Sequence, residues 1–120
     1  MANPMAAVLA KWQVAFDAHD ADAIARLFTE DALFLGFGPS PTQGRDAVRA
    51  YYAALPATLK ADFEAGDPYP LGDTVAGGFA QVLFHGPDFH EPVHLSLVLV
   101  LVDGDWRIRQ YHVSKVIPRH

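Results

Sequence analysis

The chain has 120 residues, of which 51% are hydrophobic, so it is long enough and apolar enough for one core, and we expect a single domain over residues 1–120. Nine basic against fourteen acidic residues give a formal net charge of -5, which argues against nucleic acid as a partner. The absence of cysteine excludes disulfides, thiolate metal sites and a cysteine nucleophile. No apolar run approaches the ~18 residues of a membrane helix, and the N-terminus lacks the basic start of a secretion signal. We therefore expect no membrane partner and a cytoplasmic protein.

The first half of the chain has the periodicity of helices. Apolar residues recur at every third or fourth position over residues 4–19, and shorter stretches with the same period cover 21–28 and 45–55. Between the last two, residues 32–37 predict a short strand. The Gly- and Pro-rich run that follows predicts a loop.

The second half alternates apolar and polar residues and predicts four strands at about 58–66, 74–85, 91–102 and 105–117. Turn signals such as Asp103-Gly104 separate them. Helices first and a strand meander afterwards is typical of an α+β domain. The sequence therefore predicts three N-terminal helices packed on one face of a strongly curved, mainly antiparallel sheet.

The last predicted strand has a mixed face. Alternation places two large apolar side chains, Trp106 and Ile108, on the same side as Gln110, His112 and Ser114. A solvated face would not select Trp and Ile, and a core face would not select Gln, His and Ser. The mixture indicates the wall of a ligand pocket.

The preceding strand extends this face. If Gly104 closes a three-residue loop, His94 lies opposite His112. Ser96 then lies opposite Gln110, also on the pocket face. A two-residue turn would abolish this alignment.

The opposite face of these two strands is also largely apolar. It carries Leu95, Leu97, Leu99, Arg109 and Tyr111. The helices can cover only one face of the sheet, and monomers rarely expose so large an apolar patch. We therefore expect a homodimer through this outer sheet face.

Short segments occur in a characteristic order: FDAHD at residues 16–20, IARLFTEDA at 24–32, GRDAV at 44–48, and DGDWRI at 103–108 leading to HVS at 112–114. Over nearly the whole chain they resemble the nuclear-transport-factor-2-like superfamily, in particular its SnoaL-like, SgcJ/EcaC-type group. The resemblance implies a cone-shaped α+β barrel with a deep pocket, which dimerises through the outer sheet face. The superfamily includes isomerases, dehydratases, cyclases and non-catalytic binding or assembly domains, so the fold does not decide the function.

Ketosteroid isomerase, a member of this superfamily, offers a test. It uses a carboxylate base, a protonated carboxylic acid and a tyrosine. The resemblance places Gly36, Val98 and Trp12 at these three positions. None of them can perform the corresponding role, so we do not expect the steroid isomerase mechanism.

Three residues are candidates for acid/base chemistry. His94 and His112 could exchange protons near neutral pH if they face each other in one pocket. Asp31, at the mouth of the first strand, is the acid best placed to reach the same pocket. Alternatively, the histidines are core residues satisfied by neighbouring serines, and Asp31 is a turn residue. No Asp or Glu shares the face of these histidines on the same strands, and no His-x-His or His-x-x-x-His pattern helps to form a metal site. We therefore expect neither a metal nor a cofactor.

Ligand contacts are expected from aromatic and hydrogen-bonding side chains. Aromatic residues in the helices can stack on a flat ligand, or belong to the core, and the amide and hydroxyl groups of the last strands can orient its polar group. The candidates are Trp12, Phe16, Tyr51, Tyr52, Ser96, Gln110 and Ser114.

Two functional hypotheses follow. One is a cofactor-independent enzyme of isomerase, dehydratase or cyclase type, performing acid/base chemistry on a small, mainly apolar organic substrate. The other is a non-catalytic ligand-binding or dimerisation domain of the same fold. Two opposed histidines favour the first hypothesis, and the lack of a carboxylate pair or catalytic triad favours the second.

Overall fold

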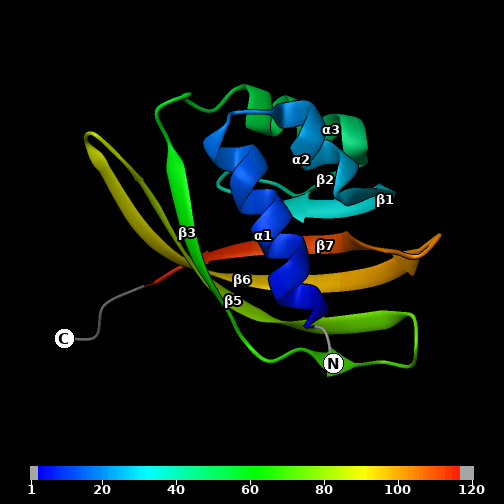
Figure 1. Ribbon diagram of the computed structural model, residues 1–120. Coiled ribbons are helices and arrows are strands. Elements are labelled where there is room, and N and C mark those ends of the chain that lie inside the picture. The colour runs from blue at the N-terminus through cyan, green and yellow to red at the C-terminus, as the bar shows by residue number, and fades with distance from the viewer. Residues whose placement is uncertain (1–2, 117–120) are drawn as a thin grey trace.

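Three helices pack on one face of a curved sheet in a computed structural model, which describes residues 3–116 (Figure 1). The helices are α1 (Pro4–Asp17), α2 (Ala21–Arg26) and α3 (Arg45–Ala53). The strands are β1 (Phe28–Leu35), β2 (Thr42–Gln43), β3 (Lys60–Ala65), β4 (Tyr69–Pro70), β5 (Val75–Gly86), β6 (Phe89–Val102) and β7 (Asp105–Lys115). The expected α+β fold is confirmed.

The sheet has the strand order β2-β1-β7-β6-β5-β3, and β4 pairs with β5. All neighbours are antiparallel except β1 and β7, which run parallel. The sheet bends around α1 but its edges do not meet, so the expected barrel is an open cone (Figure 1).

The helix starts follow from capping. The Asn3 side chain accepts a hydrogen bond from the Ala6 backbone N–H at 3.1 Å, and Pro4 occupies the first turn of α1. The Asp20 side chain accepts one from the Ala23 N–H at 3.0 Å and begins α2. None of the helices in the described residues is long and apolar enough to span a membrane.

The core lies between α1 and the inner face of the sheet. On β6, Leu95, Leu97 and Leu99 are each at most 1% exposed, and Tyr111 of β7 is 2% exposed. These are four of the residues that we expected at an outer dimer face, and that expectation is wrong. The helices cover this face because it carries the unbroken row of leucines.

The β6–β7 hairpin turns on two residues instead of three. Val102 pairs with Asp105, and both turn residues have positive φ, 51° at Asp103 and 86° at Gly104. This is the backbone of a type I′ hairpin turn, which Asp-Gly favours. The predicted three-residue loop is therefore wrong.

Further along the hairpin, Arg109 is an extra residue in β7. Leu99 pairs with Ile108, but Val98 pairs with Gln110, so the register shifts by one at this point. A β-bulge of this kind moves the side chains beyond it to the opposite face. The residues predicted to share one face of the last strand therefore lie on two faces, with the apolar residues before the bulge on one and the polar residues after it on the other.

The bulge decides on which face the polar residues at the end of β7 lie, whereas those of β6 alternate with its buried leucines. Ser96 pairs with His112 and His94 pairs with Ser114, while Gln110 lies on the same side. These five side chains share a face, as expected, but it is the outer face and not the pocket face. Trp106 and Ile108 precede the bulge and point inward with the core.

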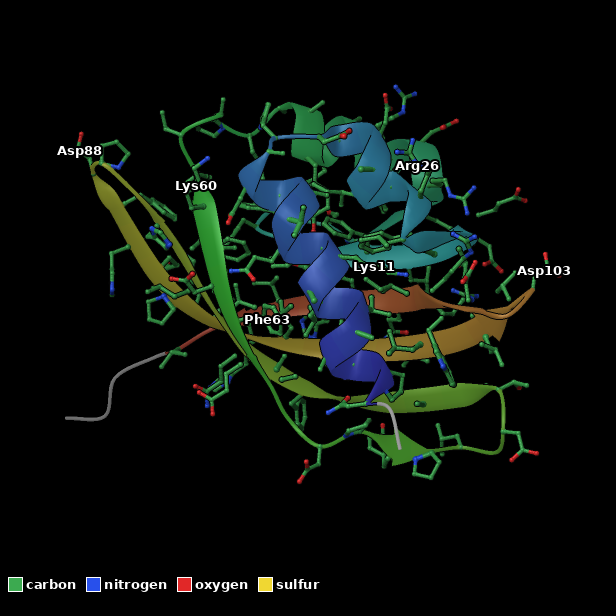
Figure 2. The ribbon with its side chains drawn as sticks, in the orientation of Figure 1. Lys11, Arg26, Lys60, Phe63, Asp88 and Asp103 are labelled. Atoms are coloured by element: carbon green, nitrogen blue, oxygen red, sulfur yellow. The ribbon has the colours of Figure 1, made fainter. Side chains whose placement is uncertain are left out.

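Two hairpins mark opposite ends of the sheet. Asp103 lies at the tip of the β6–β7 hairpin, and Asp88 at the tip of the β5–β6 hairpin (Figure 2). The end that carries Asp88 bends toward the side on which the helices pack, next to the start of β3 at Lys60 (Figures 1 and 2). This bend leaves space between the hairpin and the end of α3.

Candidate functional site

A cavity of about 550 Å³ occupies this space. Its walls come from α1, α3, the segment that leads into β3, the β5–β6 hairpin and the end of β7. Most of the lining side chains are apolar, including Phe16, Leu55, Leu59, Phe84 and Phe89. A mainly apolar concavity with a few polar groups is the usual form of a small-molecule site.

Three tyrosines supply hydroxyl groups to the cavity. Tyr52 accepts a hydrogen bond from Trp12 Nε1 at 3.2 Å and is also hydrogen-bonded to the Tyr111 hydroxyl. The Tyr51 hydroxyl accepts from the Phe37 backbone N–H at 3.0 Å. All three tyrosines line the cavity. We call them the tyrosine cluster.

The tyrosine cluster has more protons than its own hydrogen bonds use. The bonds from Trp12 and Phe37 use hydroxyl lone pairs and not hydroxyl protons. Among residues 3–116 the Tyr51 and Tyr52 hydroxyls therefore accept hydrogen bonds without donating one, and their protons can be donated to a molecule in the cavity.

Burial keeps these hydroxyls neutral. It raises the pKa of Tyr51, and the hydrogen bond from Phe37 only partly opposes this. It raises the pKa of Tyr52 more strongly, against the hydrogen bonds from Trp12 and Tyr111, and holds the pKa of Tyr111 well above its usual range. The cluster therefore acts as a hydrogen-bond donor at neutral pH and cannot act as a base.

Gly36 makes room for the cluster. A Cβ atom at this position would lie 2.6 Å from both Cζ and the hydroxyl oxygen of Tyr51. The same position is the one that the family resemblance assigns to the carboxylate base of ketosteroid isomerase. Here the Tyr51 ring packs directly against the backbone of Gly36, so any side chain at residue 36 would have to displace Tyr51.

Charged groups gather at the mouth. Lys115 Nζ lies 3.1 Å from Glu91 Oε1 and 5.7 Å from the centroid of the Phe37 ring. Asp88, at the hairpin tip, also borders the cavity (Figure 2). The cavity thus has an apolar body, a layer of phenols and a charged rim.

The sequence of residues 5–118 matches the family model described as the SnoaL-like domain. The chain belongs to this family. A comparison with curated proteins gives no significant match for this SnoaL-like chain.

Solved structures with the nuclear-transport-factor-2-like fold are similar to this SnoaL-like domain. A Mycobacterium tuberculosis protein of unknown function is 23% identical with a TM-score of 0.79, over 94% of this chain and 74% of that one. A ketosteroid isomerase-like protein from Erwinia carotovora is 18% identical with a TM-score of 0.77, over 96% and 95%. An NTF-2 like protein of unknown function from Shewanella oneidensis is 17% identical with a TM-score of 0.81, over 92% and 96%. At these identities the likeness shows the fold.

The aromatic residues singled out in the sequence are the ones that the SnoaL-like fold brings together. Phe16, Tyr51 and Tyr52 line the cavity. Trp12 is fully buried and does not line the cavity, but it packs against Phe16 and Phe84 of the lining and donates a hydrogen bond to Tyr52. Its role is to orient Tyr52.

The predicted acid/base residues lie elsewhere. His94 and His112 are on the outer sheet face, and no imidazole of the described residues borders this cavity. His94 and Ser114 instead line a separate cavity of about 540 Å³ on the outer face. The expected contacts from Ser96, Gln110 and Ser114 are absent from the cavity because Ser96 alternates with the buried leucines of β6, and the bulge in β7 turns Gln110 and Ser114 to the same outer face.

Asp31 is also misplaced by the sequence argument. It lies on the surface, where its carboxylate is 3.5 Å from Arg109 Nε and its backbone oxygen accepts a hydrogen bond from the same guanidinium at 3.1 Å. Asp31 therefore contacts Arg109, the extra residue of the bulge. The guanidinium of Arg109, which we expected in the dimer interface, is paired with Asp31 within the same chain.

Sequence reasoning missed Tyr111, Glu91 and Lys115. The sequence contains a signal for Glu91. In the alternation of β6, Val93 and Glu91 follow the buried leucines on the same face toward the β5–β6 hairpin. Tyr111 and Lys115 lie beyond the bulge, and nothing in the local pattern reveals that shift. No group of three or more His, Asp or Glu side chains in residues 3–116 is arranged to hold a metal ion.

Replacing Gly36 by Ala should disrupt the tyrosine cluster. The added methyl group overlaps the Tyr51 ring, so we expect a loss of about 1–3 kcal/mol in the free energy of unfolding, measured by denaturant titration. Gly38→Ala is the matched control on the same loop, because nothing lies within 4 Å of its Cβ. Equal stability of the two variants would contradict this packing.

The cluster should make unfolding sensitive to alkali. Above the usual tyrosine pKa of 10.0 the unfolded chain releases phenol protons that the folded chain retains, so stability is fully present below that pH and falls above it. Denaturant titrations at stepped pH should show this fall, with phenolate absorbance rising together with loss of helical circular dichroism. Tyr52→Phe should reduce the slope of the unfolding free energy against pH by the equivalent of about one proton per molecule. Phenolate formation by all tyrosines without unfolding would refute it.

Proposed function

We propose that this SnoaL-like domain binds a small, mainly apolar molecule carrying an oxygen that accepts hydrogen bonds. The observation that carries the proposal is the pair of hydroxyl protons without a protein acceptor, facing a cavity of about 550 Å³. An apolar wall supplies binding free energy, and the phenols supply selectivity.

The selectivity follows from burial. Tyr52 and Tyr111 are 3% and 2% exposed, so their hydroxyls have little access to solvent water. A ligand with an oxygen at this depth satisfies the donors, whereas a hydrocarbon of the same shape leaves them unpaired. A carbonyl group suits a site with two donors because its oxygen has two lone pairs.

Catalysis by a histidine pair in this cavity is not supported, because neither His94 nor His112 borders it. The phenols of the tyrosine cluster stay protonated and cannot remove a proton from a substrate. Within the cavity lining, the remaining ionisable side chains are Asp88, Glu91 and Lys115, all at the mouth. The geometry therefore favours the binding hypothesis over the acid/base enzyme.

Acetophenone and ethylbenzene test the donor pair, since they differ in one carbonyl oxygen. We expect acetophenone to bind more tightly, as measured by calorimetry or NMR titration. Tyr51→Phe and Tyr52→Phe should each weaken acetophenone binding about tenfold, the value of one hydrogen bond, and leave ethylbenzene binding unchanged.

Tyr69→Phe is the control, because Tyr69 is 53% exposed and does not line the cavity. If acetophenone and ethylbenzene bind equally to the wild type and to both variants, the phenols do not recognise the ligand.

We also propose a homodimer through the outer sheet face, with a different set of residues from the one expected. Phe79 lies in the middle of β5 and is 70% exposed, in one row with Ser96 and His112. An exposed aromatic residue on a sheet face is typical of the centre of a protein interface. A second copy of this face is the partner that closed symmetry favours.

Phe79→Lys should weaken self-association, since a two-fold axis would bring two such charges into one interface. Analytical ultracentrifugation over a range of concentrations should show a dimer for the wild type and a monomer for the variant. Val14→Lys, at a 72% exposed position of α1 away from the sheet, should leave the dimer intact. A wild-type chain that remains monomeric throughout would exclude this interface.

A further inference from the structure

An ammonium group already occupies the mouth of the cavity. Lys115 Nζ lies 3.1 Å from the Glu91 carboxylate and 5.7 Å from the centre of the Phe37 ring. A carboxylate and an aromatic face together are the elements with which proteins bind organic cations. The protein's own lysine thus marks the kind of group that this part of the cavity accommodates.

The two partners of the ion pair are not equally held. The Glu91 side chain is 25% exposed and belongs to β6, whereas the Lys115 side chain is 62% exposed and comes from the last residue of β7. Moving Lys115 into solvent breaks an exposed contact of small value, and its long side chain regains rotamer freedom. Glu91 stays in the wall in either case.

Resting on the proposed function above, we propose that the mouth binds the ammonium group of an organic amine, which replaces Lys115 against Glu91 and Phe37. The apolar body of the amine then extends toward the tyrosine cluster. A carboxylate ligand is disfavoured because Asp88 and Glu91 outnumber Lys115 in the lining. Lys115 is accordingly a built-in competitor of the ligand.

Tyramine, tyrosol and para-hydroxyphenylacetate separate these possibilities. They share a hydroxyphenyl body and end in an ammonium, an alcohol and a carboxylate. Affinities from calorimetry or NMR titration at neutral pH should follow that order for the wild type. Glu91→Gln should bring tyramine to the affinity of tyrosol, because the amide keeps the shape of the side chain and removes its charge.

The competitor is tested by Lys115→Met, which keeps the length of the chain but removes the ammonium. We expect tyramine to bind about fivefold more tightly, with tyrosol unchanged. Lys11→Met is the matched control: it removes the same charge from α1, outside the cavity lining, and should alter no affinity (Figure 2). Thermal unfolding of each variant establishes that it is folded.

The outcomes distinguish the two proposals. Equal binding of the three probes with no effect of Glu91→Gln, or tightest binding of the carboxylate, overturns the ammonium site and leaves the cavity as a neutral binding site. Failure of all three probes, with acetophenone still bound, also overturns it. Failure of acetophenone as well overturns the proposed function together with the ammonium site.

Discussion

The cavity depends on one extra residue in β7. Arg109 is held by Asp31 on one side, and the neighbouring Ile108 N–H donates to the Leu27 carbonyl at 2.8 Å. Side chains on a strand alternate between two faces, so an inserted residue exchanges the faces for the rest of the strand. This insertion turns Tyr111 into the interior and leaves His112 outside.

The tyrosine cluster is the polar layer that results from this arrangement. Phe34 stacks on Tyr111 with ring centroids 4.7 Å apart, and Trp12 fixes the hydroxyl of Tyr52. Each phenol is held by a neighbour from a different element, so the donors are oriented before a ligand arrives. Preorganised donors in an apolar site lose little conformational entropy when a molecule binds.

Sequence alone predicts most of the elements because their periodicities are long. The helices and the four long strands begin and end within a few residues of their predicted bounds, whereas β2 and β4 have two residues each and no period to detect. The face of β7 is different in kind. Its alternation runs unbroken through Arg109, and the bulge comes from contacts with α2 and β1, which a local pattern does not contain. The row of leucines in β6 was the better guide to the interior.

The parallel pairing of β1 with β7 also has a consequence for how the chain is made. Phe34 of β1 stacks on Tyr111 of β7, which lines the cavity, although 77 positions separate the two residues in the sequence. One edge of β1 pairs with β2, and the other edge pairs with β7. During synthesis this second edge stays unpaired until β7 has been made. Long-range pairing of this kind is slow and leaves an open strand edge in the meantime. The wall that Tyr111 contributes to the cavity therefore cannot be completed before β7 has been synthesised.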